Sequence, residues 1–179
     1  MTAPVPPELL QKALRKITAA LKGLGRGSAV IGDLAHRSYG IPLEPRAVEV
    51  LVPAADETLL SAARGEGLRT TDDALLLRWH DAAVAAAADV RLLEASTPRL
   101  ARVLDRARPA DILGVGVPVA SCNDLILLRA GSADPADRKM LVELLRHGAG
   151  RIDPPLLKKE AEEAGVFDAL RSAWQEARA

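Results

Sequence analysis

The sequence predicts a mixed α/β domain of the α+β type, followed by a helical C-terminal part. Three observations support this. The chain opens with amphipathic helical periodicity, short β-branched runs bounded by glycine and proline follow, and the last third has helical patterning throughout. Its 179 residues suit one domain of ordinary size. We expect an α/β core over residues 1–130 and helices over 131–179 that pack on it as one structural unit.

The first half of the chain alternates helices and strands. Residues 8–22 predict an amphipathic helix, because leucine and isoleucine recur at spacings of three and four residues. Residues 28–31 are a short apolar run and predict a buried strand, and residues 33–39 can form two helical turns. The clearest strand is 47–52, in which Val48, Val50 and Val52 share one face and Ala47, Glu49 and Leu51 share the other.

The middle of the chain is less regular. Residues 56–64 predict a helix with an acidic first turn. Residues 74–95 are interpreted as a hairpin, although the alanines at 82–88 have helix propensity. Residues 98–107 predict a helix capped by Thr97, and residues 112–119 carry two apolar pieces separated by glycine, which predict short strands or a turn.

The C-terminal part is expected to be helical throughout. Ser121 is a helix cap with Asp124 at the third helical position, and that helix runs to about residue 129. Three amphipathic segments follow, at 135–147, 154–164 and 166–177, and glycine ends the first two of them.

Composition narrows the class of protein. Acidic and basic residues balance at 24 each, so the whole surface is not built to follow nucleic acid, although a local basic patch stays open. The single cysteine, Cys122, fits a reducing compartment, and we expect a cytoplasmic protein. No signal peptide and no apolar run of membrane-spanning length is expected. The bias toward alanine, arginine, leucine and glycine is typical of a GC-rich bacterial genome.

One constellation points to chemistry. A helix and a strand are followed by a turn at Gly32 and Asp33, a short helix, and a strand carrying Glu49. Metal-dependent transfer of a nucleotidyl group needs these parts, because backbone N–H groups at such a turn can face a triphosphate. Carboxylates that alternate on one strand, joined by a third from a neighbouring strand, can hold two Mg²⁺ ions.

The sequence resembles the nucleotidyltransferase superfamily, in particular its minimal and AbiEii-toxin-like members. The segments that carry the resemblance lie within residues 10–175 and read KALRKITAALKGLG, SAVIGDLAHRSYGIPLEPRAVEVLVP and VPVASCNDLILLRAGSADPADRKMLVELL. The resemblance implies a mixed sheet flanked by helices, with NTP and Mg²⁺ as ligands. It implies a nucleotide-binding role for Gly32, Asp33 and Arg46, and a catalytic, metal-binding role for Glu49.

Several positions depart from the family pattern. Asp33 stands where the family has glycine or serine, and Ala47 stands where the first carboxylate is expected. The third acid would fall near Arg91, and Asp89 is the nearest substitute for it as a catalytic acid. The family's helix lysine is replaced by Arg129, whereas its downstream aspartate is present as Asp137. These departures predict a member that keeps the fold but is catalytically impaired.

Structural roles are open for the same residues. Asp33 is also a suitable helix cap, Glu49 a suitable solvated strand residue and Asp89 a suitable strand-edge charge. His36, His80 and His147 show no metal-ligand spacing, and no partner motif marks Cys122 as a nucleophile.

Three functions therefore remain in view. The first is a nucleotidyltransferase-like protein that binds a nucleotide but has lost efficient transfer, which the resemblance places beside toxin–antitoxin or phage-defence systems. The second is an active enzyme that moves a nucleoside monophosphate from an NTP to a protein or tRNA. The third is a non-enzymatic module whose C-terminal helices bind a protein partner or a second copy, through an apolar patch drawn from these residues: Leu156, Leu157, Val166, Leu170 and Trp174.

Overall fold

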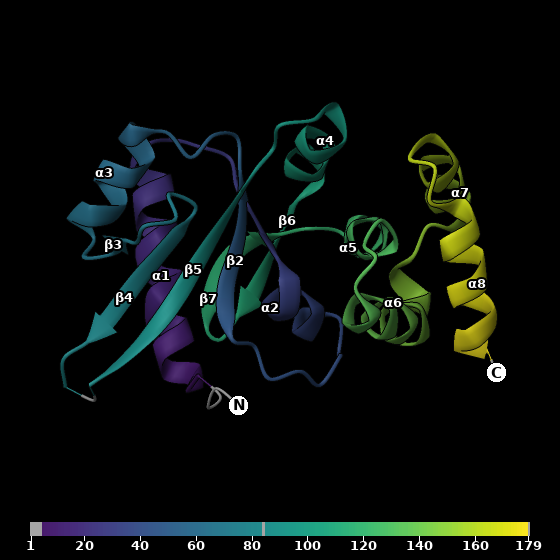
Figure 1. The fold of residues 1–179 in the computed structure, drawn as a ribbon, viewed down its shortest axis with the longest axis horizontal. Helices are drawn as coiled ribbons and strands as arrows, with labels where there is room; N and C mark the ends of the chain where they lie inside the picture. Colours follow the sequence, from purple (N-terminus) through teal and green to yellow (C-terminus); the bar gives the residue numbers. More distant parts are fainter. Residues whose placement is uncertain (1–4, 84, 179) are drawn as a thin grey trace. The chain divides into compact units, whose positions relative to one another are not determined.

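The computed structural model describes residues 5–83 and 85–178. Contacts between Cα atoms divide the chain into two compact units. The first unit contains the residues up to Ser38 together with Leu43–Ala120, and the second contains Tyr39–Pro42 together with the residues from Ser121 onward. Figure 1 shows the helices and strands as a ribbon with their labels. Among the described residues, no helix is both long and apolar enough to cross a membrane.

The first unit is built on one mixed sheet of seven strands (Figure 1). From edge to edge the strands are β3 (Arg69–Thr70), β4 (Leu76–Asp81), β5 (Ala86–Glu94), β2 (Ala47–Val52), β1 (Ala29–Ile31), β7 (Val115–Val119) and β6 (Arg108–Ile112). The pairs β2–β5 and β1–β7 are parallel, and the other neighbours are antiparallel. The sheet confirms the predicted mixed α/β class.

The two faces of the sheet differ in burial. On the core face, Val48, Val50 and Val52 are fully buried beneath α1 (Pro7–Gly23), which also packs against α3 (Glu57–Gly65). On the opposite face, alternation and register place ten side chains of β2, β5 and β4 together, and we call this the open face: Ala47, Glu49, Leu51, Ala87, Asp89, Arg91, Leu93, Leu76, Arg78 and His80. Arg91, Leu93 and His80 are exposed there.

Local sequence rules account for the helices of the first unit. α1 begins at the predicted prolines, and α3 follows Asp56, whose Oδ1 accepts a 3.0 Å hydrogen bond from the Leu59 amide. α2 (Gly32–Ser38) starts one residue earlier than predicted. α4 (Pro98–Arg106) is capped by Thr97, as predicted.

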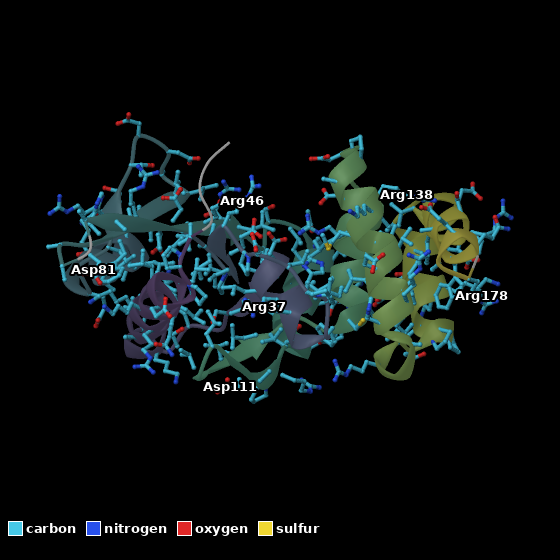
Figure 2. The ribbon with its side chains drawn as sticks, turned by 90° about the horizontal axis from the view of Figure 1, so that it is seen from below. Arg37, Arg46, Asp81, Asp111, Arg138 and Arg178 are labelled. Carbon is cyan, nitrogen blue, oxygen red and sulfur yellow. The ribbon has the colours of Figure 1, made fainter. Side chains whose placement is uncertain are left out.

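The second unit is helical, as expected. It contains α5 (Cys122–Ala130), α6 (Pro135–His147), the short 3₁₀ turn η1 (Ala149–Arg151), α7 (Pro154–Glu163) and α8 (Phe167–Arg178). Arg138 of α6, labelled in Figure 2, ties that helix to α8 by donating to the Ala169 carbonyl at 2.9 Å and to Glu176 at 3.0 Å. The expected packing of these helices on the α/β core stays a prediction.

Some predicted boundaries were wrong. β3 was not anticipated, and β6 begins at Arg108, directly after the helix that was predicted to reach residue 107. The hairpin over 74–95 is confirmed as β4 and β5, but the alanines at 86–88 belong to β5 rather than to a helix. Pairing with β4 over residues 86–91 outweighs the small helix preference of alanine.

Candidate functional site

The turn at Gly32 is filled by the side chain of Glu49. Gly32 joins β1 to α2 with a φ of +65°, a conformation that favours glycine. A Cβ atom built on Gly32 would lie 2.6 Å from Cδ and 3.1 Å from Cβ of Glu49. The Glu49 carboxylate therefore leans toward the β1 side of β2 and occupies the space above the turn.

Asp89 is drawn in the opposite direction. It lies opposite Ala47 on β2 and opposite Arg78 on β4. Arg78 donates to both carboxylate oxygens of Asp89, at 2.6 Å from Nε and 3.2 Å from Nη2. This pairing raises the pKa of Arg78 above its ordinary value, chiefly through the hydrogen bond and then through charge attraction. The Asp89 carboxylate is thus held toward β4, away from β2.

Arg91 stands beside Glu49. The two residues are directly opposite in the parallel register of β2 and β5, and Leu76 is opposite Arg91 on the other side. Arg91 is exposed, and its guanidinium makes no hydrogen bond or ion pair with any of the residues that the structure describes. A cation therefore lies beside Glu49, at the position where the resemblance predicts an acid.

These positions do not fit a two-metal site. The Cα atoms of Glu49 and Asp89 are roughly 8 Å apart, from adjacent strands and a two-residue offset. Carboxylates at that separation could converge, but here they lean apart, and Ala47 offers no ligand. No group of three or more metal-binding side chains is found within residues 5–83 and 85–178. The arrangement can hold an anion by arginine more readily than it can hold paired Mg²⁺.

The remaining predicted nucleotide-binding residues are Asp33 and Arg46. Asp33 is half-buried in the first turn of α2, and Arg46 is exposed directly before β2. Figure 2 shows Arg46 and Arg37, the latter on α2. Arg37 also lines a small hollow of about 170 Å³ with Leu34 and Asp111. The roles of Gly32, Asp33, Arg46, Glu49 and Asp89 stay predictions, although the structure shows where each lies.

The sequence also singled out Arg129, Asp137, Cys122 and three histidines. Arg129 and Asp137 are bonded to each other by an ion pair within the second unit. Cys122 is buried, and burial raises the pKa of its thiol to about 11, which disfavours the reactive thiolate at neutral pH. His36 is buried in α2, whereas His80 and His147 are exposed and far apart in the sequence.

One important residue was missed from the sequence. Arg78 controls the direction of Asp89, yet it lies in a segment, Leu76–Asp81, that shows no motif. The signal was the hairpin itself: pairing the two predicted strands across the intervening turn would have set Arg78 opposite Asp89.

An apolar hollow lies between α7 and α8. It has a volume of about 250 Å³ and is lined by Pro154, Leu157, Lys158, Phe167, Leu170, Arg171 and Trp174. Of the residues expected to form an apolar patch, Leu157, Leu170 and Trp174 line this hollow, whereas Leu156 is 36% exposed outside its lining.

Comparison with known proteins identifies the fold. No protein-family model matches the sequence, and no curated protein matches it significantly. An antigenic nucleotidyltransferase-like protein from Paracoccidioides brasiliensis is similar in structure, with a TM-score of 0.57 and 12% identity over 93% of this chain and 95% of that one. The antibiotic-resistance factor ANT(2'')-Ia gives a TM-score of 0.53 with 15% identity over 94% and 95% of the two chains. JHP933 from Helicobacter pylori gives 0.54 with 11% identity over 96% and 93%. The chain thus has a nucleotidyltransferase-like fold, as the resemblance predicted.

Proposed function

We propose that this chain, which has a nucleotidyltransferase-like fold, binds a nucleotide on the open face, beside the Gly32 turn, but has lost efficient nucleotidyl transfer. The observation that carries the proposal is the divergence of the two remaining acids. Glu49 leans over Gly32, Asp89 is held by Arg78, and Ala47 replaces the first carboxylate.

The chemistry of transfer explains why this divergence matters. In an active two-metal site, converging carboxylates hold Mg²⁺ ions, which activate the attacking hydroxyl and stabilise the leaving pyrophosphate. The residues present here do not fit a pair of Mg²⁺ ions. Binding makes weaker demands, because exposed guanidinium groups such as Arg46 and Arg91 can pair with phosphate oxygens.

The experiment is a calorimetric titration of the purified protein with ATP, GTP, CTP and UTP, each in Mg²⁺ and in EDTA. We expect saturable binding of at least one NTP, weakened by Arg46→Gln. The matched control is Arg64→Gln, since Arg64 lies on α3 and pairs with Glu57 there. Absence of binding to every NTP at millimolar concentration would refute the proposal.

A transfer assay separates this proposal from an active enzyme. The protein is incubated with NTPs labelled at the α-phosphate, Mg²⁺ or Mn²⁺, and a mixture of proteins and tRNA as acceptors. We expect the acceptors to carry no more label with the unaltered protein than with its Glu49→Gln variant. Labelled acceptor that disappears in Glu49→Gln would favour the alternative, an active transferase moving a nucleoside monophosphate to protein or tRNA.

A second candidate function is protein binding through the second unit. The hollow between α7 and α8 favours it, because Phe167 and Trp174 give it apolar walls of a size that suits side chains of a partner helix. Sedimentation over a hundredfold concentration range tests a second copy as that partner. A protein that is monomeric at every concentration would refute a second copy as the partner. A bacterial setting beside toxin–antitoxin systems stays a prediction of the resemblance.

A further inference from the structure

We infer that the open face binds phosphate groups directly through arginine, with no requirement for a divalent metal. The inference rests on the proposed function and concerns how the same site recognises its ligand. Its starting point is that the residues present do not fit a two-metal site. Ala47 offers only a methyl group, Asp89 is held by Arg78, and Arg91 brings a guanidinium.

The arginines form a continuous group across three strands. Arg69 of β3 is directly opposite Arg78 of β4, and Arg78 is opposite Asp89 of β5. Arg91 lies two residues further along β5, on the same face. With Glu49 opposite Arg91 included, three guanidiniums face two carboxylates, so one positive charge remains in excess, to which an anion would be attracted.

Repulsion between the arginines in the ligand-free protein also favours anion binding. Like charges directly opposite each other on an antiparallel pair are destabilising, and Arg69 and Arg78 are such a pair. Asp89 offsets one of the two charges. Arg69 and Arg91 are both exposed, and neither has a hydrogen-bond or ion-pair partner among the described residues. Their donors are available to a ligand.

The spacing suits a chain of phosphates rather than a single ion. The Cα atoms of Arg78 and Arg91 are roughly 8 Å apart, and those of Arg69 and Arg91 roughly 12 Å, from the strand separation and the residue offset. Arginine side chains are long enough to converge across such distances, and each guanidinium can bind phosphate in a bidentate manner. A di- or triphosphate fits this span.

Glu49 makes a metal-bound ligand less favourable at this place. Its carboxylate is committed to the space above Gly32, on the side of β2 away from Arg91 and β5. A Mg²⁺–triphosphate complex carries less negative charge than the free triphosphate, so an arginine group attracts it less strongly. Free polyphosphate should therefore bind at least as tightly as its magnesium complex.

The test uses sodium tripolyphosphate as the probe, titrated calorimetrically into the full chain in EDTA and in Mg²⁺. We expect binding in EDTA that is equal to or tighter than binding in Mg²⁺. Arg91→Gln should weaken binding in EDTA by fivefold or more. Arg91→Lys should weaken it by less, because lysine keeps the positive charge but cannot bind phosphate in a bidentate manner. The control is again Arg64→Gln. Far-ultraviolet circular dichroism confirms that each variant is folded.

With tripolyphosphate as the probe, three outcomes would overturn the inference: binding only with Mg²⁺, no binding under either condition, or an Arg91→Gln variant that matches Arg64→Gln. The result also separates this inference from the proposed function. NTP binding that requires Mg²⁺ would refute metal-free recognition and leave the proposed function standing. Metal-free tripolyphosphate binding without binding of any NTP would support the anion site and refute the nucleotide role.

Discussion

Replacing Gly32 by alanine tests the close approach between the turn and Glu49. Two effects add at this position. A residue with a Cβ atom at a φ of +65° is strained by about 1–2 kcal/mol relative to glycine. The new methyl group would also overlap Glu49, whose Cδ would be 2.6 Å away, and would force that side chain out of its present rotamer.

Gly25 separates the two effects. Its φ is +63°, and nothing lies within 4 Å of a Cβ built on it. Gly25→Ala should therefore cost only the backbone strain, about 1–2 kcal/mol. Gly32→Ala should cost about 1 kcal/mol more, because an off-rotamer glutamate adds roughly 0.5–1.5 kcal/mol. In a Glu49→Ala background the overlap is gone, and the two glycine substitutions should become equal.

Urea unfolding measures these free energies. Each unit contains one tryptophan, Trp79 in the first and Trp174 in the second, so fluorescence of a Trp174→Phe background follows the first unit alone. A difference of 1 kcal/mol corresponds to about 2–4 °C in Tm for a chain of this size. If Gly32→Ala and Gly25→Ala are equally destabilising with Glu49 present, the packing of Glu49 over Gly32 is refuted.

Two further predictions concern pH. Asp56 accepts hydrogen bonds from Arg26 through both carboxylate oxygens, and chiefly these bonds lower the pKa of Asp56 to about 2. The stability that the Asp56 carboxylate contributes is therefore present above pH 3.8 and lost as the pH falls toward 2. Asp56→Asn keeps a helix cap but removes the charge, and its stability in urea should depend less on pH in that range; an unchanged slope would contradict the pairing. Burial raises the pKa of Cys122 from 9.0 to about 11, so the stability it contributes is present below pH 9 and lost as the pH rises to about 11. Reaction of Cys122 with a thiol reagent at pH 8 should be slow in the native protein and fast in guanidinium chloride, and rapid native labelling would contradict its burial.

The long helices were predictable because their signals are local. α1 and α6 show apolar residues at helical spacing, with proline at the start and glycine just after the end. The short edge strands lack such signals. Arg69 and Thr70 are both exposed and have no alternating pattern, and Pro109 in β6 argues against a strand except at an edge, which is where β6 lies.

The candidate site could be predicted only in part. The order of strand, glycine turn, short helix and acid-bearing strand follows from the sequence and is present in the structure. The directions of the acids follow from no motif, since they depend on strand register: that of β2 with the distant β5, and that within the β4–β5 hairpin. Placing Asp89 opposite Ala47 needs the parallel pairing of β2 and β5, and its capture by Arg78 needs the hairpin register.

The interior strand β1 has a consequence for how the chain assembles. It is only three residues long, yet it joins two parts of the sheet: it pairs with β2 on one side and, through Val30 and Val119, with β7 on the other. The hairpins β4–β5 and β6–β7 can form from neighbouring sequence, whereas the β1–β7 contact closes a loop of about 90 residues, a slow event in folding. During synthesis, one edge of β1 therefore stays without its partner until β7 has emerged from the ribosome. The brevity of β1 limits the length of unpaired edge that a neighbouring nascent chain could capture.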